Sequence, residues 1–190
     1  NQGYLLQDPD PAVSGIFGAL ADSEFTSVTL NQFDPKDQGT YNHATSTTIY
    51  DSLGNSHVMT QYFVKEPVDP NRADEKTVWA MYVLIDGNEV GDPDPTKPFP
   101  ENLEATRYRQ ELFFNADGTL DVTATGKMYV TNWDPKDADG NATGAVTSQN
   151  VLEGGLPLND PPTNSNFEIK LDGSTQFGSP FAVNQVSQNG

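Results

Sequence analysis

The stretch TSTTIYDSLGNSHVMTQYFVK (45–65) carries the strongest structural pattern in the sequence. Apolar and polar residues alternate on both sides of SLGN, which is typical of two antiparallel strands joined by a tight turn. Gly54 and Asn55 tolerate the positive φ that such turns use, and the carboxylate of Asp51 is suited to accept backbone N–H groups of the turn. We therefore predict a hairpin with strands at 45–50 and 57–65.

The same hairpin contains Asp51, Ser52 and His57, the three residue types of a hydrolase triad. Such a triad needs a serine within hydrogen-bond reach of an oriented histidine, together with a desolvated oxyanion site. We expect Asp51 and His57 to face each other across the end of the hairpin, with Ser52 at a solvent-exposed tip. That position favours a structural turn, so we predict no catalytic residue, no metal ligand and no cofactor.

Alternating segments with β-branched and aromatic residues recur along the chain and predict an all-β fold. Further strands are predicted at 26–30, 77–85, 107–114, 119–125, 127–133, 166–171 and 179–186, and a short helix or apolar loop at 11–25. The clearest additional hairpin is 107–125, around NADG. Loops rich in Pro, Asp and Gly are predicted at 66–75, 86–102, 134–146 and 153–166. The expected architecture is an antiparallel barrel-like or sandwich domain with long acidic loops.

The charge of the chain excludes several classes of partner. With 27 acidic and 10 basic residues, the formal net charge is −17. Nucleic acids and anionic membranes are bound through Lys and Arg, so neither is an expected partner. The sequence has no cysteine, and no apolar run reaches the length of a membrane span. Because the chain begins without Met and without a signal-peptide pattern, we expect a piece of a longer protein.

One motif recurs 100 residues apart, as NQFDPKDQG (31–39) and TNWDPKDADG (131–140). We favour the same turn used twice over a duplicated acidic ligand site. The segment DADGN (137–141) resembles the start of a calcium loop, but Ala142 and Ser148 occupy positions that such a loop gives to Gly and Glu. An exposed Trp133 among acidic residues leaves an alternative open, an extracellular β-sandwich that binds carbohydrate or calcium.

Two stretches carry motifs in a specific order and spacing. The first (33–65) contains TYN, YDSLGN, a histidine and YFVK, and a W-x-x-Y strand follows it. The second (167–190) contains TQ-aromatic-x-S, then a short strand and a Gln-x-Gly turn. In both, the chain resembles the central region of the bacterial flagellar hook protein family. The signature positions are Thr40, Tyr41, Asn42, Tyr50, Asp51, Ser52, Gly54, Asn55, His57, Tyr62, Phe63, Trp79, Tyr82, Gln176 and Phe177.

The resemblance implies a structural protein and no enzyme. Residues 1–190 would form the outer β domain of a hook subunit, with 1–30 and 86–165 as variable parts and a small extra lobe left open. Its partners would be other copies of the same subunit in a flexible, torque-transmitting filament. The resemblance also implies an extracellular location, reached through the flagellar secretion apparatus without a cleaved signal peptide. Because like charges repel, we expect the isolated chain to be monomeric.

Overall fold

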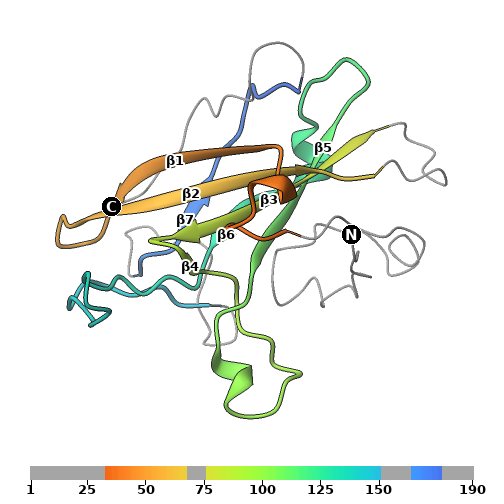
Figure 1. Cartoon of the computed structure of the whole chain (residues 1–190). Coiled ribbons are helices and arrows are strands. Elements are labelled where there is room, and N and C mark those ends of the chain that lie inside the picture. The colour runs from red at the N-terminus through yellow and green to blue at the C-terminus, as the bar shows by residue number, and fades with distance from the viewer. Residues whose placement is uncertain (1–32, 68–75, 151–163, 177–190) are drawn as a thin grey trace.

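The computed structural model describes residues 33–67, 76–150 and 164–176. The elements predicted at 11–25, 26–30 and 179–186 lie outside these ranges. Within them, nearly all regular structure is antiparallel strand, and the longest helix has four residues (Figure 1). The prediction of an all-β domain is therefore confirmed. No helix in the described part of the chain is long and apolar enough to cross a membrane.

A five-stranded antiparallel sheet forms the larger layer. Its strands are β1 (His43–Tyr50), β2 (Ser56–Lys65), β3 (Thr77–Ile85), β4 (Asn88–Glu89) and β5 (Tyr108–Phe114). The first three follow one another in order, and β4 and β5 pair with different ends of β3. The predicted 45–65 hairpin is present, with Thr48 opposite Val58 and Tyr50 opposite Ser56.

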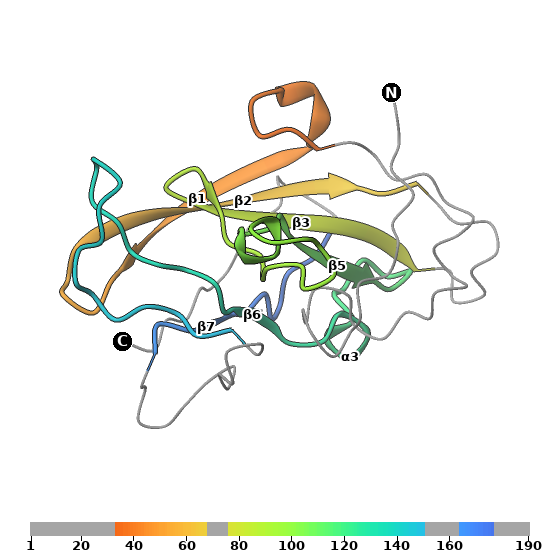
Figure 2. The same ribbon diagram turned by 90° about the horizontal axis from the view of Figure 1, so that it is seen from below.

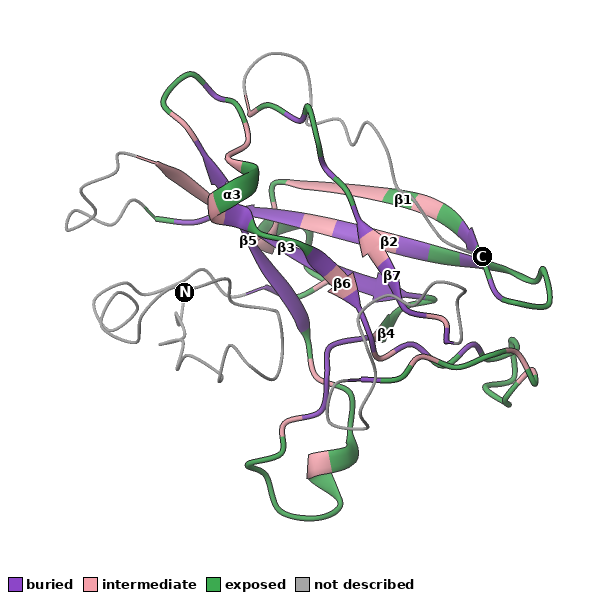
Figure 3. Cartoon of the chain, turned by 180° about the vertical axis from the view of Figure 1, so that it is seen from behind, coloured by how far each residue is buried: buried purple, intermediate pink, exposed green. Residues whose placement is uncertain are grey.

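A two-stranded sheet of β6 (Met128–Val130) and β7 (Phe167–Ile169) forms the second layer, and Figure 2 shows it below the larger sheet. Both strands were predicted, within 127–133 and 166–171. Strand β5, in the large sheet, is buried along its whole length (Figure 3). The core between the layers contains Phe63, Phe114 and Phe167, each fully buried. Full burial of one such side chain stabilises the fold by about 1.5–3 kcal/mol, so this interface holds the two layers together.

A smaller aromatic cluster covers part of the opposite face of the large sheet. The ring of Phe33 stacks on Tyr82 with centroids 4.1 Å apart and lies 5.1 Å from Tyr62. Beside the cluster, the buried guanidinium of Arg109 donates to Glu66 and Glu111 at 2.9 Å each. Burial alone would lower the pKa of Arg109, but the neighbouring carboxylates raise it, so the charge is retained inside the sheet.

The strand predicted at 119–125 is wrong for most of its length. Only a single bridge, Phe114 with Leu120, continues the predicted hairpin, and the chain then forms the helical turn α3 (Val122–Thr125). The reason is local, because the Asp121 carboxylate caps the backbone N–H groups of Thr123 and Ala124. Alternation of side chains cannot separate a strand from a capped turn this short.

The segment predicted as a loop at 86–102 also contains regular structure. Asp86 and Gly87 both have positive φ and connect β3 to β4 as a two-residue hairpin. Further on, residues Glu101–Leu103 form a short 3-10 helix. Two further strands of the stretch 86–165 pair with strands outside it, β5 with β3 and β6 with β7.

Candidate functional site

The turn between β1 and β2 is held by one carboxylate. Asp51 Oδ1 accepts the backbone N–H groups of Leu53 and Asn55 at 2.9 Å each, and Oδ2 accepts the Asn55 side-chain amide at 2.8 Å. The backbone N–H of Gly54 donates to Asp51 O at 3.0 Å, and Gly54 has φ +85°. The turn predicted from Asp51, Gly54 and Asn55 is therefore present.

The pKa of Asp51 reflects these bonds. Burial alone would raise this pKa, but the side-chain and backbone hydrogen bonds from Asn55, the backbone N–H of Leu53 and the nearby His57 together lower it to about 2. Each of these groups favours the charged form of the carboxyl. Asp51 is therefore a carboxylate at all physiological pH values, and its charge is committed to holding the turn.

His57 lies between two aspartates. Its Nδ1 is 2.6 Å from Asp86 Oδ2, and its Nε2 is 3.5 Å from Asp51 Oδ2. The second oxygen of Asp86 accepts the backbone N–H of Val58 at 2.8 Å. The ring of Trp133 meets the imidazole edge-on with centroids 5.2 Å apart. His57 thus connects the β1–β2 turn, the β3–β4 turn and the segment that follows β6.

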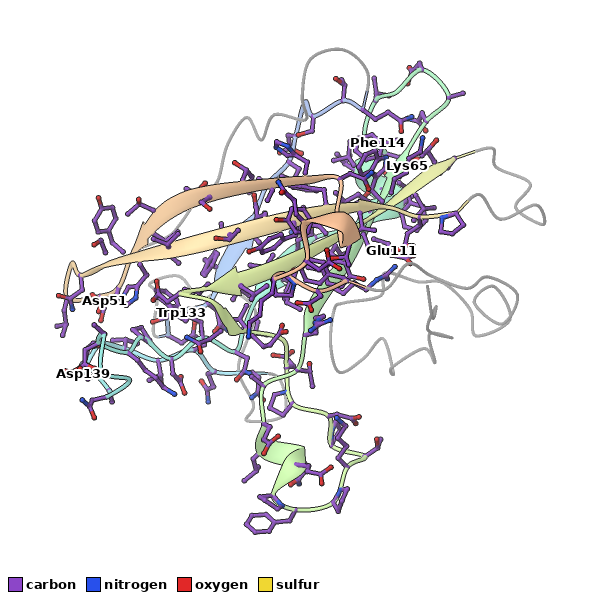
Figure 4. All side chains as sticks on the ribbon, in the orientation of Figure 1. Asp51, Lys65, Glu111, Phe114, Trp133 and Asp139 are labelled. Atoms are coloured by element: carbon purple, nitrogen blue, oxygen red, sulfur yellow. The ribbon has the colours of Figure 1, made fainter. Side chains whose placement is uncertain are left out.

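Ser52 lies at a solvent-exposed tip, as predicted, but the two charged residues beside it are buried. Asp51 is 7% exposed and His57 is 4% exposed. The segment 143–146 covers them: Thr143 Oγ1 lies 3.4 Å from Asp51 Oδ2, and the backbone N–H of Val146 donates to Ser52 Oγ at 2.7 Å. Figure 4 shows Asp51, Trp133 and Asp139 at the same end of the molecule. A segment about 90 residues away in sequence therefore packs against the turn beside Asp51, while residues 52–55 stay exposed.

These contacts do not form a triad. Asp51 and His57 face each other as expected, but His57 Nε2 has no hydrogen-bond partner among the described residues. Ser52 Oγ accepts the N–H of Val146 and does not hydrogen-bond to the imidazole. A serine nucleophile must be hydrogen-bonded to its base, so this geometry holds a turn in place and does not activate a nucleophile.

A cleft of about 990 Å³ opens beside His57. Its walls combine the turns around Asn55 and Asp86 with Trp133 and the segment that follows it. The carboxylates along it, Asp86, Glu89, Asp134 and Asp137, do not converge. No group of three or more His, Asp or Glu residues in the described ranges is arranged to hold a metal ion.

The two Asp-Pro-Lys-Asp segments do not form the same turn, so that prediction is wrong. In the first, Asp37 N donates to Asp34 O, which closes a turn within the motif itself. In the second, Lys136 bridges to Ala142 as a short antiparallel pair, and the turn falls on Asp137–Gly140. The two copies differ in the residues that follow the motif, and these residues direct the chain differently. They are Gln38-Gly39 in the first copy and Ala138-Asp139-Gly140-Asn141 in the second.

Trp133 is not exposed among the acidic residues, contrary to expectation. It is 4% exposed and packs between His57 and Phe167 in the core, with ring centroids 5.2 Å and 6.1 Å away. Carbohydrate-binding sites present an accessible aromatic face. The observation that motivated a carbohydrate-binding module is therefore removed.

The remaining signature residues of the first stretch hold the start of the large sheet. Thr40 Oγ1 closes the loop before β1 by accepting the N–H of Asp34 at 3.0 Å. Asn42 Oδ1 accepts the N–H of Lys65 at 2.8 Å, which fixes the open end of the hairpin. Tyr41 packs edge-on against Tyr62, with ring centroids 4.9 Å apart.

One contact joins the two signature stretches. Trp79 Nε1 donates to Gln176 Oε1 at 3.3 Å, and Gln176 N donates to Gly118 O at 3.0 Å. Phe177, the last signature residue, lies outside the described residues. The described signature residues therefore serve the hairpin, its aromatic cover and this closing contact.

Sequence reasoning missed three residues that complete the buried turn: Asp86, Thr143 and Val146. Asp86 stands in IDGN, a recognised turn signal, and its positive φ of 50° is typical of an Asp-Gly hairpin. An Asp-Gly pair favours the turn, but it does not identify the partner of the carboxylate, His57. Thr143 and Val146 lie in a polar loop whose sequence carries no sign of what it covers.

Comparison with known proteins gives a family match over most of the chain. The model of the flagellar basal body protein FlaE D2 domain matches residues 20–190. Two curated relatives, the flagellar hook protein FlgE of Salmonella typhimurium and that of Salmonella typhi, are each 28% identical over 133 residues. The alignment covers 63% of this chain and 30% of each relative. The chain therefore spans under a third of their length, and no solved structure matches it.

Proposed function

The chain belongs to the FlaE D2 domain family, and on that premise we propose that it is the outer β domain of a bacterial flagellar hook subunit. The match over residues 20–190 carries the proposal. We propose that residues 1–190 form this domain as one unit. In this role the domain lies on the surface of the hook and contacts other copies of the same subunit. Its function is structural and involves no catalysis.

The physical properties of the domain support this role. A curved filament that bends as it rotates needs contacts between subunits that slide, and polar contacts of modest area meet that need better than a large apolar seam. The formal net charge of −17 opposes tight association of isolated copies. Contacts between such domains are then weak individually and gain strength from repetition along the filament.

The location follows from the same proposal. A hook subunit is extracellular, and we propose export through the flagellar secretion apparatus without a cleaved signal peptide. The chain contains no cysteine, so its folding outside the cell depends on no disulfide. The domain would then fold after export through the packing of its two sheets alone.

Deletion of residues 20–190 from the full hook protein tests the proposal. Secretion of the shortened subunit should continue, because export depends on other parts of the protein, while the hooks change in curvature or bending stiffness. The measurements are subunit recovered from the medium and hook shape by electron microscopy. The matched control is the full protein with Val122→Ser, an exposed position on α3. Normal curvature and stiffness in the deletion variant would refute the role.

Sedimentation of the 190-residue chain tests the weak-contact aspect. At micromolar concentration we expect a monomer, both at low ionic strength and at 0.15 M salt, where the Debye length is about 8 Å. A stable dimer under these conditions would contradict the proposed sliding contact.

A further inference from the structure

A segment of the large middle region projects from the domain with apolar residues at its end. Residues 91–106, here called the knob, extend away from the sheets in Figures 1 and 3. Phe99 is 79% exposed and Leu103 is 66% exposed. Large apolar side chains this exposed are costly in water, and when they gather on one projection they mark an interaction site.

The base of the knob is fixed to the domain. Gly91 and Thr106 exchange two backbone hydrogen bonds, of 2.8 Å and 3.0 Å. A Cβ on Gly91 would lie 2.7 Å from the backbone oxygen of Thr106, so this close approach requires glycine. Thr131 and Asn132, which follow β6, donate to Asp92 Oδ1 and Gly91 O at 2.7 Å and 2.8 Å. The knob is therefore attached to both sheets.

The knob is also stiff along its length. Its sequence GDPDPTKPFPENLEAT contains four prolines, each of which fixes its own φ. Asp94 caps the turn that follows it, accepting the N–H of Thr96 at 2.9 Å, and Leu103 N donates to Pro100 O at 2.9 Å. A segment that is ordered before binding loses little conformational entropy when it docks. Phe99 and Leu103 are thus presented on a preorganised projection.

The most suitable receiving surface among the described residues is an uncharged one around Tyr50 and Val58. The outer face of the β1–β2 hairpin, here called the hairpin face, consists of Ser46, Thr48, Tyr50, Ser56, Val58 and Thr60. All six are uncharged, in a chain with 27 acidic residues. Tyr50 is 56% exposed and Val58 is 49% exposed, and Leu53 at the adjacent turn is 61% exposed.

The charges of the knob favour the uncharged hairpin face over acidic parts of the surface. The knob contains four acidic residues, Asp92, Asp94, Glu101 and Glu104, against a single Lys97, so acidic surfaces repel it. The hairpin face offers no like charge, and Asp86, which accepts the N–H of Val58, is already paired with His57. Contact with the hairpin face therefore buries apolar area on both partners with the smallest electrostatic cost.

We propose that the knob of one copy docks on the hairpin face of a neighbouring copy. The inference rests on the proposed function, since it names the surfaces through which hook subunits meet. The two patches differ, so the contact is head-to-tail, and a head-to-tail contact that does not close generates a filament rather than a dimer. The modest size of both patches keeps each contact weak, which suits sliding during bending.

Thiol crosslinking in assembled hooks tests the inference. The full hook protein would carry both Phe99→Cys and Val58→Cys. The 190 residues contain no native cysteine. Any native cysteine in the rest of the hook protein would be replaced by Ser. Treatment of purified hooks with a short bis-maleimide should give a ladder of dimers, trimers and longer species on a denaturing gel. The matched control pairs Phe99→Cys with Val122→Cys, which is 53% exposed on α3. The test pair should crosslink roughly tenfold more, because neighbouring thiols in the filament are at millimolar effective concentration.

Two outcomes overturn the inference in distinguishable ways. If the hooks contain the variant subunit but the test pair crosslinks no better than the control, the knob contact is wrong while the proposed function stands. If the hooks do not contain this protein, the proposed function fails and takes the inference with it. If the double variant fails to assemble, the two single variants are mixed with excess wild-type subunit and assembled together. Crosslinked dimers then support the contact, and their absence refutes it.

Discussion

Two turns of the molecule share the pattern Asp-x-x-Gly-Asn and nearly the same hydrogen bonds. In the first, Asp51 Oδ1 accepts the N–H groups of Leu53 and Asn55 at 2.9 Å each. In the second, Asp137 Oδ1 accepts those of Asp139 and Asn141 at 3.0 Å and 2.8 Å. The glycines have φ values of +85° and +82°. Five residues are therefore enough to specify this turn wherever it occurs.

The surroundings of the two turns differ. Asp51 is buried beside His57 and Thr143, whereas Asp137 is exposed. Hydrogen bonds lower the pKa of both carboxyls, despite the opposing effect of burial at Asp51. The comparison shows that local sequence sets the conformation of a turn, while segments distant in sequence decide how much of the fold depends on it.

Removal of the two carboxylates should separate the turns most strongly. Asp51→Ala removes the acceptor of three part-buried hydrogen bonds and one of the two carboxylates beside His57, so we expect a loss of about 2–4 kcal/mol in unfolding free energy. In Asp137→Ala the freed donors are open to water, which replaces the lost bonds, so the loss should be clearly smaller. Urea unfolding of both variants measures the difference. Equal losses would show that burial of the first turn contributes nothing.

Substitution of the glycines should make the two turns behave alike. No atom lies within 4 Å of a Cβ built on Gly54 or Gly140, so Val at either position meets only backbone strain at positive φ. We expect each variant to lose about 1–3 kcal/mol. Urea unfolding of Gly54→Val and Gly140→Val gives the comparison. Stability equal to wild type for Gly54→Val would contradict the turn as a folding device.

Acid should weaken the domain through Asp51. Its folded-state pKa of about 2 lies below the unfolded value of 3.8, so the stabilisation is complete above pH 4 and is lost as pH falls through 2. With allowance for solvent screening, this contributes about 1–2 kcal/mol. The difference in unfolding free energy between wild type and Asp51→Asn should shrink by that amount between pH 5 and pH 2. A constant difference across this range would refute the assigned cause.

The smallest effect is expected at Ser52. Its hydroxyl accepts the N–H of Val146, but both residues are exposed, so water can replace the lost bond in Ser52→Ala. The expected change is about 0.5 kcal/mol, measured by the same urea unfolding. A loss above 2 kcal/mol would mean that this bond, and not Asp51, anchors the covering segment.

The sequence predicted the parts of the fold that local patterns control. The 45–65 hairpin, β3 and β5 follow from alternation and turn residues, because each face of a strand meets one environment. The strand predicted at 119–125 failed because the capping bonds of Asp121 favour a helical turn. Burial of Asp51 and Trp133 was not predictable, since it depends on packing of segments that are far apart in sequence.

A helical reconstruction of the hook by electron cryo-microscopy would locate the domain in the filament. We expect the two-layered β domain at the outermost radius, with the knob of each copy in contact with the hairpin face of a neighbour. Density for this domain at the inner tube, or a hook whose outer density does not accommodate the five-stranded sheet, would contradict this expectation.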